Sequence, residues 1–372
     1  MITPSIERVS SGPTYSMTNL ANHLAMSPHL NFNLVTFNFF DTKKDANNLK
    51  PYETRFDLLG PKKLGFSLTF IFFLIKEIRS NDEIIIYNNS QYFLHSISIF
   101  ILRAIFKFNL IFSARGSLDE VSLNKTGRVK LKKLLIRPYL RLLNFVDYMI
   151  CTSNLEIKSI KRFFPKKDIF LLPNSIDPPN IKEIPKKNKV IYLGRIVPQK
   201  GVHDLINAWK KNINSTRNWE LQIIGDSSDQ KYLNRLVDLS KELDNVKFLG
   251  EVYGNDKWKL ISESKFLVLP SYSENFGNVV IEGMSLGTVP ITTNDIPWKE
   301  LEENDVGFCC AREDLAEVLG NAIMMPEVNF MPLSKRTRQY ALNLYHATNV
   351  ANKFVDFLLN LNIERDKKSY NK

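Results

Sequence analysis

The amino-acid sequence predicts an α/β protein built from two doubly wound, Rossmann-like domains. Three observations support this: a length of 372 residues, short apolar runs that alternate with longer helical patterns, and a proline-rich break near the middle. The length favours two domains, because single hydrophobic cores rarely grow beyond about 250 to 300 residues. Short strands that alternate with helices are typical of βαβ units and parallel sheets.

The first half of the chain carries the first set of alternating elements. Strand-length apolar runs stand at 32–39, 83–87 and 110–114, and helical patterns lie between them at 66–79 and 92–107. This order predicts consecutive strand–helix–strand units with a parallel sheet.

The two most apolar stretches of the chain fall in these helical patterns. "FSLTFIFFLI" has only ten residues, and "FLHSISIFILRAIFKF" is interrupted by His95 and Arg103. A membrane-spanning helix needs roughly 20 apolar residues, so we expect two buried helices of an α/β domain instead. His95 is expected to be a packed histidine rather than a base.

The second half repeats the alternation. Five apolar runs, "KVIYLG", "ELQIIG", "VKFLG", "KFLVLP" and "VPITT", read as strands, and helical patterns separate them near 201–212, 229–243, 255–263 and 277–286. This pattern predicts a second doubly wound unit.

A proline-rich break separates the halves. "LLPNSIDPPNIKEIPKKNK" contains four prolines and little apolar periodicity, which suits a connection between domains. We expect an N-terminal domain at 1–177 and a C-terminal domain at 178–349, with a helix at about 350–365 that packs back on the first domain.

Charge and cysteine content narrow the function classes. The chain carries 50 Lys+Arg against 39 Asp+Glu, a net charge of +11, which suits a phosphorylated ligand, a nucleic acid or an anionic membrane. Nucleic-acid binding would need aromatic residues among the basic ones, and 124–141 offers Tyr139 alone. The three cysteines show no metal-binding spacing, and the start "MITPSIERVSSGPTYS" does not read as a signal peptide. We expect a reducing, cytoplasmic location.

The stretch "YLGRIVPQKGVHDLINAWK" joins a strand that ends at Gly194 to a helix that begins near Gly201. Arg195 and Lys200 lie on the connecting loop. Ligands of open α/β sheets bind at the carboxyl ends of the strands, and two cations there suit a diphosphate. A solvated basic turn is the alternative.

The stretch "SENFGNVVIEGMSLG" turns the chain from a strand into a helix and carries two glutamates. The backbone N–H groups at this helix start can hold a phosphate, and Gly277 lets the backbone approach a ligand closely. Glu282 can reach a sugar hydroxyl, whereas Glu274 either faces the ligand or merely complements the helix dipole. The candidate ligand-binding residues in this turn are Asn275, Phe276, Gly277, Asn278, Val279 and Glu282.

Together with "LQIIGDSSDQKYLNRL", "VKFLGEV" and "LLPNSID", these stretches resemble the retaining, nucleotide-sugar-dependent glycosyltransferases of the GT-B type with an E-x7-E motif. The family is that of glycosyl transferases group 1, also called glycosyltransferase family 4. The resemblance implies two Rossmann-like domains that face a cleft. It covers almost the whole chain and is strongest in the second half.

The resemblance also implies roles for individual residues. Arg195 and Lys200 would neutralise the donor diphosphate, and Phe276 and Gly277 would supply backbone donors to that diphosphate or to the donor sugar. Glu282 would bind the ribose. Glu274 would lie at the donor sugar, where it would hold the sugar's hydroxyls or stabilise the cationic sugar. No cofactor is implied, and we expect no metal, because no Asp-x-Asp pair is present to hold one.

Two features of the first domain depart from the family pattern. The family's glycine-rich turn is reduced to Gly12 and Pro13, which are either a loop beneath the donor phosphates or an ordinary helix start. The expected histidine is replaced by Arg115 in "LIFSARGSLDE", as in a subgroup with a Pro-Arg-Gly motif. Arg115 either stabilises a phosphate or the acceptor, or pairs with Asp119 or Glu120.

A basic amphipathic segment follows at 125–141. It is either a surface for an anionic membrane and a lipid-linked acceptor, or a solvated face over an apolar stripe. Its cations are Lys125, Arg128, Lys130, Lys132, Lys133, Arg137 and Arg141.

The resemblance therefore implies a hexosyltransferase-type glycosyltransferase that moves a sugar from a nucleoside-diphosphate sugar to a glycan or lipid-linked acceptor with retention. The expected setting is synthesis of bacterial lipopolysaccharide, O-antigen, capsule or exopolysaccharide, on or near the inner face of the cytoplasmic membrane. The alternative is a catalytically degenerate GT-B protein that scaffolds an assembly complex. The presence of Arg195, Lys200, Glu274 and Glu282 argues for the enzyme.

Overall fold

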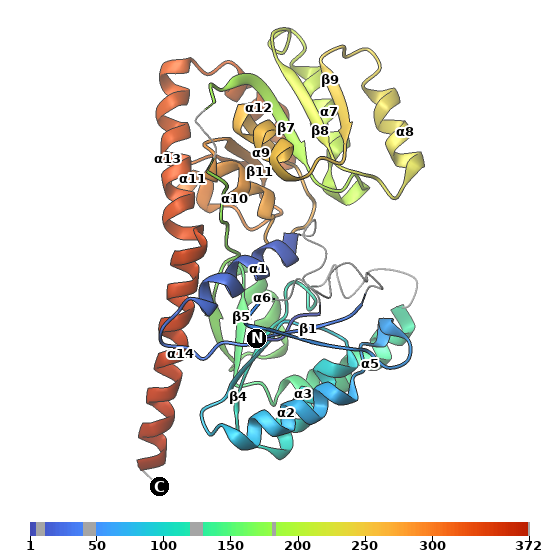
Figure 1. Cartoon of the computed structure of the whole chain (residues 1–372). Coiled ribbons are helices and arrows are strands. Elements are labelled where there is room, and N and C mark those ends of the chain that lie inside the picture. The colour runs from blue at the N-terminus through green and yellow to red at the C-terminus, as the bar shows by residue number, and fades with distance from the viewer. Residues whose placement is uncertain (5–11, 40–49, 120–128, 181–183, 371–372) are drawn as a thin grey trace. The chain divides into compact units, whose positions relative to one another are not determined.

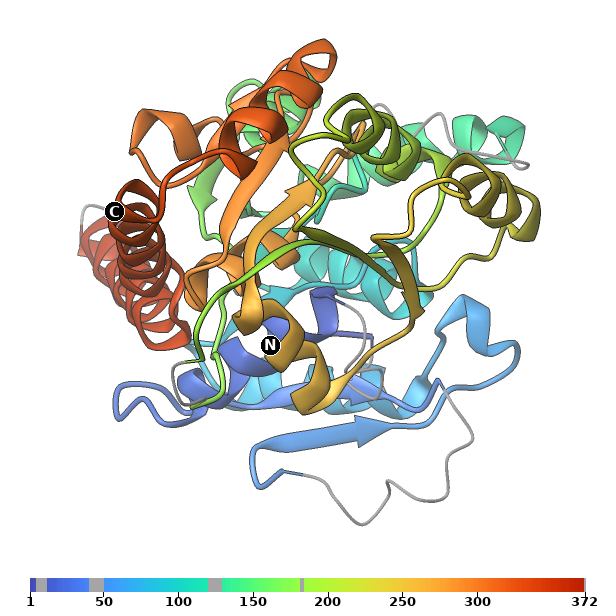
Figure 2. The same cartoon turned by 90° about the horizontal axis from the view of Figure 1, so that it is seen from above.

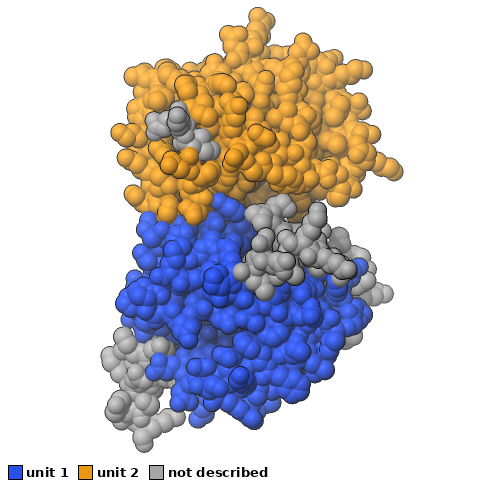
Figure 3. Space-filling model, viewed as in Figure 1, with its two compact units in different colours: residues 1–175, 347–372 blue, residues 176–346 orange. Residues whose placement is uncertain are grey.

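The computed structural model describes residues 1–4, 12–39, 50–119, 129–180 and 184–370 (Figure 1). The chain forms two compact units, drawn in separate colours in Figure 3. Unit 1 comprises residues 1–175 and 347–372, and unit 2 comprises 176–346. The sequence-based division falls after residues 177 and 349.

Unit 1 is built on parallel strands. Strand β1 pairs with β2, and four further strands follow in the order β3-β4-β5-β6. Ile2 forms parallel bridges to Val35 and to Asn88, so the short segment at residues 1–3 joins the two sets. The strands are β1 (Leu34–Phe37), β2 (Glu53–Phe56), β3 (Ile85–Asn88), β4 (Asn109–Ser113), β5 (Tyr148–Cys151) and β6 (Asp168–Leu171).

Helices cover both faces of this sheet. One core contains side chains of α2 (Leu68–Ser80), α3 (Leu94–Ile105), α5 (Val129–Leu143) and α6 (Asn154–Phe163). A second core contains side chains of α1 (Gly12–Ala25) and α14 (Ala347–Tyr370). The last helix therefore belongs to unit 1 although it follows unit 2 in the chain.

Helices α2 and α3 correct the expectation of two buried helices. In α2, the Ser67 hydroxyl accepts from the N–H of Phe70, and Phe70, Leu74 and Ile78 face the core. The opposite side is open to solvent: Phe72 is 69% exposed and Ile105, on α3, is 68% exposed. Both helices lie in a layer with the core on one side only, so apolar residues all around them cannot all be covered. No helix among the described residues is both long and apolar enough to cross a membrane.

His95 is a packed histidine, as predicted. It is fully buried, its ring stacks on Phe37 at a centroid distance of 4.0 Å, and its Nδ1 lies 2.8 Å from the carbonyl oxygen of Gly65. Burial lowers the pKa of His95 to about 4. The ring is therefore neutral at pH 7.

Unit 2 is a six-stranded parallel sheet in the order β12-β11-β10-β7-β8-β9. Its residues run from light green to orange in Figure 2. The strand order reverses between β7 and β10, which are neighbours in the sheet. Ligands of doubly wound sheets bind at this switch point, outside the carboxyl ends of the strands. The strands are β7 (Lys187–Leu193), β8 (Glu220–Ile224), β9 (Val246–Gly250), β10 (Ser264–Leu269), β11 (Val289–Thr293) and β12 (Phe308–Cys310).

The helices of unit 2 form two groups. Helix α7 (Val202–Lys211) contacts α8 (Gln230–Leu239) and α12 (Leu315–Ile323). Helix α10 (Asn278–Ser285) contacts α9 (Gly254–Glu263) and α13 (Glu327–Tyr345). A short helix, α11 (Glu300–Glu303), follows β11.

Candidate functional site

The switch point of unit 2 brings together two residues that are 74 positions apart in the chain. Lys200 ends a 3-10 turn (Pro198–Lys200) after β7, and Glu274 lies on the loop after β10. The Lys200 ammonium group forms an ion pair with the Glu274 carboxylate, and the Ser271 hydroxyl donates to the same carboxylate oxygen at 3.1 Å. Both side chains of the pair are 15% exposed.

The two loops are joined through their backbones as well. The N–H of Tyr272 donates to the carbonyl oxygen of Gln199 at 2.9 Å. Gly201 has a left-handed φ of 66°, and a Cβ atom there would lie 2.1 Å from the Pro270 carbonyl oxygen. Only glycine permits this approach, so Gly201 fixes the distance between the two loops.

The start of α10 is held by an aromatic cluster. Phe276 is buried against Trp298 and Tyr345, and the Trp298 indole N–H donates to the Phe276 carbonyl oxygen. Gly277 caps the helix with a φ of 85°, and Asn278 and Val279 form its first turn. Among the described residues, the N–H groups of Phe276 and Gly277 donate to no backbone carbonyl. A helix start with such donors suits an anion.

Arg195 and Asn275 complete the predicted set at this edge of the sheet. The Tyr192 hydroxyl donates to the Arg195 carbonyl oxygen at 2.8 Å, which holds the loop while the Arg195 side chain stays exposed. Within the described part of the chain, the Arg195 guanidinium has no carboxylate partner within salt-bridge distance. Asn275 is half-buried in the turn before α10.

Glu282 lies on α10 and is 4% exposed. Its carboxylate faces the Lys257 ammonium group of α9, with Oε2 and Nζ 2.7 Å apart. The second glutamate of the E-x7-E motif therefore has its own lysine partner. A ribose hydroxyl at this position would approach an ion pair rather than a lone carboxylate.

Arg115 lies in unit 1, immediately after β4, with a left-handed φ of 44°. Its guanidinium donates to the amide oxygens of Asn89 at 3.2 Å and Asn174 at 2.8 Å, and it contacts the sulfur of Met17. No described contact joins Arg115 to Asp119, and Glu120 lies outside the described residues. Neutral partners surround most of this cation.

Glu156 holds the backbone beside Arg115. Its two carboxylate oxygens accept from the N–H of Gly116 at 2.7 Å and from the N–H and hydroxyl of Thr152 at 2.7 and 2.9 Å. Burial raises the pKa of Glu156, whereas these hydrogen bonds act in the opposite direction. The carboxylate thus ties the turn after β4 to the end of β5.

Other predicted residues of unit 1 are placed by their backbone alone. Gly12 and Pro13 form the first residues of α1. Lys130, Lys132 and Lys133 lie on α5 with Arg137 and Arg141, of which the last two are exposed. Lys125 and Arg128 lie outside the described residues.

Sequence reasoning missed three residues of the site in unit 2: Ser271, Lys257 and Trp298. Ser271 stands next to the motif and carries a weak signal, because a serine three residues before Glu274 can reach its carboxylate. Lys257 and Trp298 carry none, since Lys257 reaches Glu282 only through the packing of α9 against α10, and Trp298 reaches Phe276 only from the loop between β11 and α11. No group of three histidine, cysteine, aspartate or glutamate residues that could hold a metal ion occurs among the described residues.

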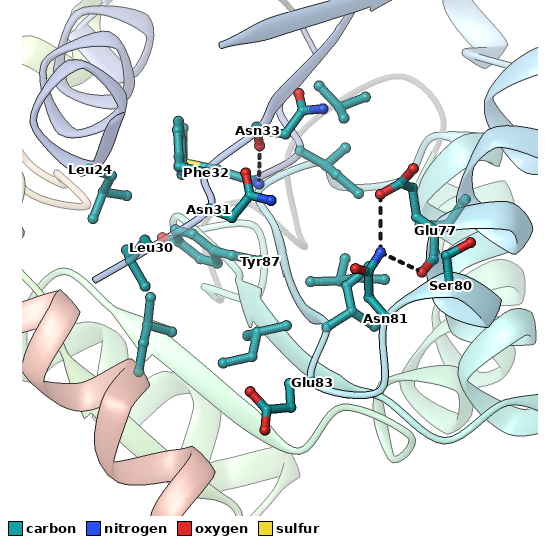
Figure 4. A pocket seen from close by; sticks show the side chains of 18 of the residues that line it. Leu24, Leu30, Asn31, Phe32, Asn33, Glu77, Ser80, Asn81, Glu83 and Tyr87 are labelled. Atoms are coloured by element: carbon teal, nitrogen blue, oxygen red, sulfur yellow. Dashed lines mark hydrogen bonds between the residues drawn. The ribbon is translucent and has the colours of Figure 1, made fainter. Parts of the chain in front are cut away.

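A cavity of about 790 Å³ lies elsewhere, in unit 1 (Figure 4). Leu24, Leu30, Phe32 and Tyr87 contribute to its lining, and Glu77 and Asn81 lie at one side. It opens at the amino ends of β1 and β3, whereas ligands of such sheets bind at the carboxyl ends. The cavity therefore does not coincide with the candidate donor site.

Comparison with known proteins shows similarity in the same part of the chain. The family model of glycosyl transferases group 1 matches residues 173–341. Glycogen synthase of Mycobacterium tuberculosis is 28% identical over 173 residues, which cover 45% of this chain and 42% of the relative. The capsular polysaccharide biosynthesis glycosyltransferase CapM of Staphylococcus aureus is 33% identical over 111 residues, 28% of this chain and 27% of the relative. The chain spans less than half the length of the curated relatives that it matches first.

Solved structures resemble the whole chain. Sucrose-phosphate synthase of Thermosynechococcus elongatus has a TM-score of 0.73 at 20% identity and covers 95% of this chain and 94% of its own. Anabaena HepE, solved in complex with UDP-glucose, has a TM-score of 0.72 at 17% identity and covers 96% and 98%. At 17 to 20% identity, the similarity shows the fold alone, and this is the GT-B fold. The match to glycosyl transferases group 1 lies in residues 173–341, somewhat less than half of the chain.

Proposed function

We propose that this protein is a hexosyltransferase that moves a sugar from a nucleoside-diphosphate sugar to a glycan or lipid-linked acceptor, with retention of anomeric configuration. One observation carries the proposal: Arg195, the Lys200–Glu274 pair and the start of α10 meet at the switch point of unit 2. In an open α/β sheet this is the ligand-binding position.

The chemistry of glycosyl transfer suits these groups. Departure of a nucleoside diphosphate creates negative charge on the leaving group, and fixed cations beside it lower the barrier. Arg195 is exposed and has no described carboxylate partner, so it can engage a phosphate without breaking a contact. Lys200 must exchange Glu274 for the diphosphate. That exchange would free Glu274 for the donor sugar, which becomes cationic in the transition state.

The α10 start would hold the diphosphate by its N–H groups, and Glu282 with Lys257 would bind the ribose. We further propose that the reaction needs no metal, because Arg195 and Lys200 supply the positive charge that a divalent ion supplies elsewhere. The support for this part is the charge of the two side chains and their place at the switch point.

The relatives support the substrate class. HepE was solved with UDP-glucose, and CapM is named for capsular polysaccharide biosynthesis. By analogy, we propose that this chain uses a nucleotide sugar as its donor and that its product is a bacterial surface polysaccharide. Arg115, whose guanidinium donates to the neutral side chains of Asn89 and Asn174 in unit 1, would take a phosphate or the acceptor.

A thermal-shift screen with nucleoside diphosphates and their sugars identifies the donor, because a ligand that binds only the folded state raises the melting temperature. Transfer with that donor then compares the parent with Arg195→Ala, Lys200→Ala and the double variant. Each single change is expected to cost about 2 to 4 kcal/mol of transition-state stabilisation. Asp226→Ala, on the neighbouring loop after β8, is the matched control. Undiminished turnover in a folded double variant would exclude the donor assignment.

A further inference from the structure

One arginine, Arg312, connects several loops at the carboxyl edge of the sheet of unit 2. It begins a 3-10 turn (Arg312–Asp314) after β12. Its Nη1 donates to Asp204 Oδ2 and to the Pro270 carbonyl oxygen, both at 3.1 Å, and its Nη2 donates to the Asp295 carboxylate. These partners lie in the first turn of α7, at the end of β10 and on the loop after β11. A single side chain therefore joins four segments of unit 2.

The same guanidinium packs on the loop that carries Glu274. Its Cζ lies 3.4 Å from the ring centroid of Tyr272, so the cation covers the aromatic face. Tyr272 stands two residues before Glu274, and its N–H donates at 2.9 Å to the carbonyl oxygen of Gln199, the neighbour of Lys200. Arg312 thus holds the residue through which the two loops of the candidate donor site are joined.

The Pro270 carbonyl oxygen is the second point of attachment. It accepts from Arg312, and it lies only 2.1 Å from the place that a Cβ atom of Gly201 would take. Asp204 lies one turn further along, in α7, and accepts from the same guanidinium nitrogen. Arg312 therefore contacts both the loop before Glu274 and the helix that follows the Lys200 turn.

This set of contacts suits a guanidinium and no other cation. The side chains of Arg312 and Asp204 are only 21% and 22% exposed, so their charge-assisted hydrogen bond is partly shielded from water. A guanidinium donates in two directions while its flat face stays on an aromatic ring. Lysine carries the same charge on one nitrogen and has no flat face, so it cannot keep all of these contacts.

We propose that Arg312 is a positioning residue that keeps the Lys200 turn and the Glu274 loop at the distance at which their side chains pair. It acts through Tyr272, Pro270 and Asp204. The consequence for sugar transfer rests on the proposed function, whereas the effect on the two loops does not.

Amide hydrogen exchange in the whole protein tests the effect on the loops. Arg312→Met removes the charge and both directions of donation. The Tyr272 amide, which donates to Gln199, should then exchange about tenfold faster, because local opening exposes it. Arg312→Lys should restore little of this protection. Asp295→Ala, at a side chain that is 48% exposed, is the milder variant and should accelerate the same amide about threefold, since one charge-assisted bond is lost.

Lys265→Met is the matched control for Arg312→Met. Lys265 lies at the amino end of β10, whereas Pro270 directly follows its carboxyl end. It too combines an ion pair, with Glu327, and a contact with an aromatic face, that of Trp219. Its loss should leave the exchange of the loops after β7 and β10 as in the parent.

Sugar transfer is the second measurement. At saturating donor, the single-turnover rate should fall about tenfold in Arg312→Met and stay low in Arg312→Lys, because small displacements of catalytic groups are costly. A parent that transfers no sugar would contradict the proposed function, and the exchange comparison would still decide the role of Arg312.

Three results would overturn the proposal. Equal exchange of the Tyr272 amide in the parent and in Arg312→Met would show that the loops are joined without this side chain. Full recovery in Arg312→Lys would show that a positive charge alone suffices. Faster exchange throughout unit 2, including the amides of β8, in step with a lower free energy of unfolding would show a general structural role.

Discussion

At the scale of single residues, the ion pair between Lys200 and Glu274 makes a specific prediction for Glu274→Gln. The neutral amide releases Lys200 from its partner. The nucleoside diphosphate should therefore bind as tightly as to the parent or more tightly. Turnover should fall steeply, because the negative charge beside the cationic sugar is lost.

Calorimetry with the nucleoside diphosphate and single-turnover transfer measure the two effects. Glu282→Gln serves as the contrasting variant, since it alters the Lys257 pair near the proposed ribose position, and its nucleotide affinity should fall about tenfold, or 1.4 kcal/mol. Equal losses of affinity in both variants, with equal turnover, would disprove the separate roles of the two glutamates.

His95 predicts how stability depends on pH. Burial lowers its pKa to about 4, below the usual value of 6.5, so the folded protein binds the proton less readily than the unfolded chain. The contribution of the neutral ring is complete above pH 6.5 and is lost as the pH falls from 6.5 toward 4. It should amount to about 3 kcal/mol, at 1.36 kcal/mol for each pH unit.

Urea unfolding between pH 4 and 7 checks this effect. His95→Leu should lower stability at pH 7 through lost packing and the lost hydrogen bond between the ring and the Gly65 carbonyl oxygen, yet show a shallower fall on acidification than the parent. Identical pH dependence in the two proteins would mean that His95 does not titrate in this range. His23→Leu, at a half-buried site on α1, is a comparison with a histidine outside the core.

How much of the site is visible in the sequence depends on the kind of contact. The proximity of Lys200 and Glu274 could be expected, because each follows a parallel strand and such strands end at one edge of the sheet. The partners of Glu282 and Phe276 could not. Lys257 reaches Glu282 through the packing of α9 against α10, and Trp298 reaches Phe276 from the loop after β11, and neither spacing nor residue type gives a signal for such contacts.

At the scale of elements, the join between the loops after β7 and β10 rests on Gly201. Gly201→Ala should destabilise the protein by well over the roughly 1 kcal/mol cost of a left-handed backbone, because its Cβ atom would lie 2.1 Å from the Pro270 carbonyl oxygen. Gly254→Ala is the matched control: its φ is 57°, and a Cβ atom there has nothing within 4 Å.

Denaturant unfolding measures the stability of the Gly201→Ala and Gly254→Ala variants. Sugar transfer measures their activity. Displacement of the Gly201 loop moves Lys200 away from Glu274, so activity should fall more than stability in Gly201→Ala. The idea fails if the two alanine variants lose the same stability and retain the same activity.

The elements that the sequence predicted well are those with long apolar runs. Strands β7 to β11 follow from such runs. Four strands were missed, and each has only three or four residues: β2 (Glu53–Phe56), β5 (Tyr148–Cys151), β6 (Asp168–Leu171) and β12 (Phe308–Cys310). Helices α2 and α3 were recognised, but their exposed sides were not, because apolar residues occupy both the core side and the outer side and no polar stripe marks the surface.

At the scale of the whole molecule, the chain passes from unit 1 into unit 2 and back again. The passage occurs after residues 175 and 346, and α14 returns to unit 1. The sequence predicts that the chain crosses between the units near the proline-rich break and near the last helix, since the composition changes there. It could not show which residues of unit 2 stand next to each other at the two passages.

Those residues are Ile176 and His346, which form a parallel bridge, while the N–H of Ile176 donates to the Tyr345 carbonyl oxygen at 2.8 Å. Unit 2 is thus an insertion whose two ends are neighbours. Such a unit can be replaced without moving the two ends of unit 1 to which it is joined. Residues 176–346 expressed alone should unfold cooperatively and bind the nucleoside diphosphate. Replacement of residues 176–346 with the corresponding segment of a relative, at the same two junctions, should give a folded chimaera with the relative's nucleotide preference. The adjoining ends of unit 2 thus make this chain suitable for exchange of the nucleotide-binding unit.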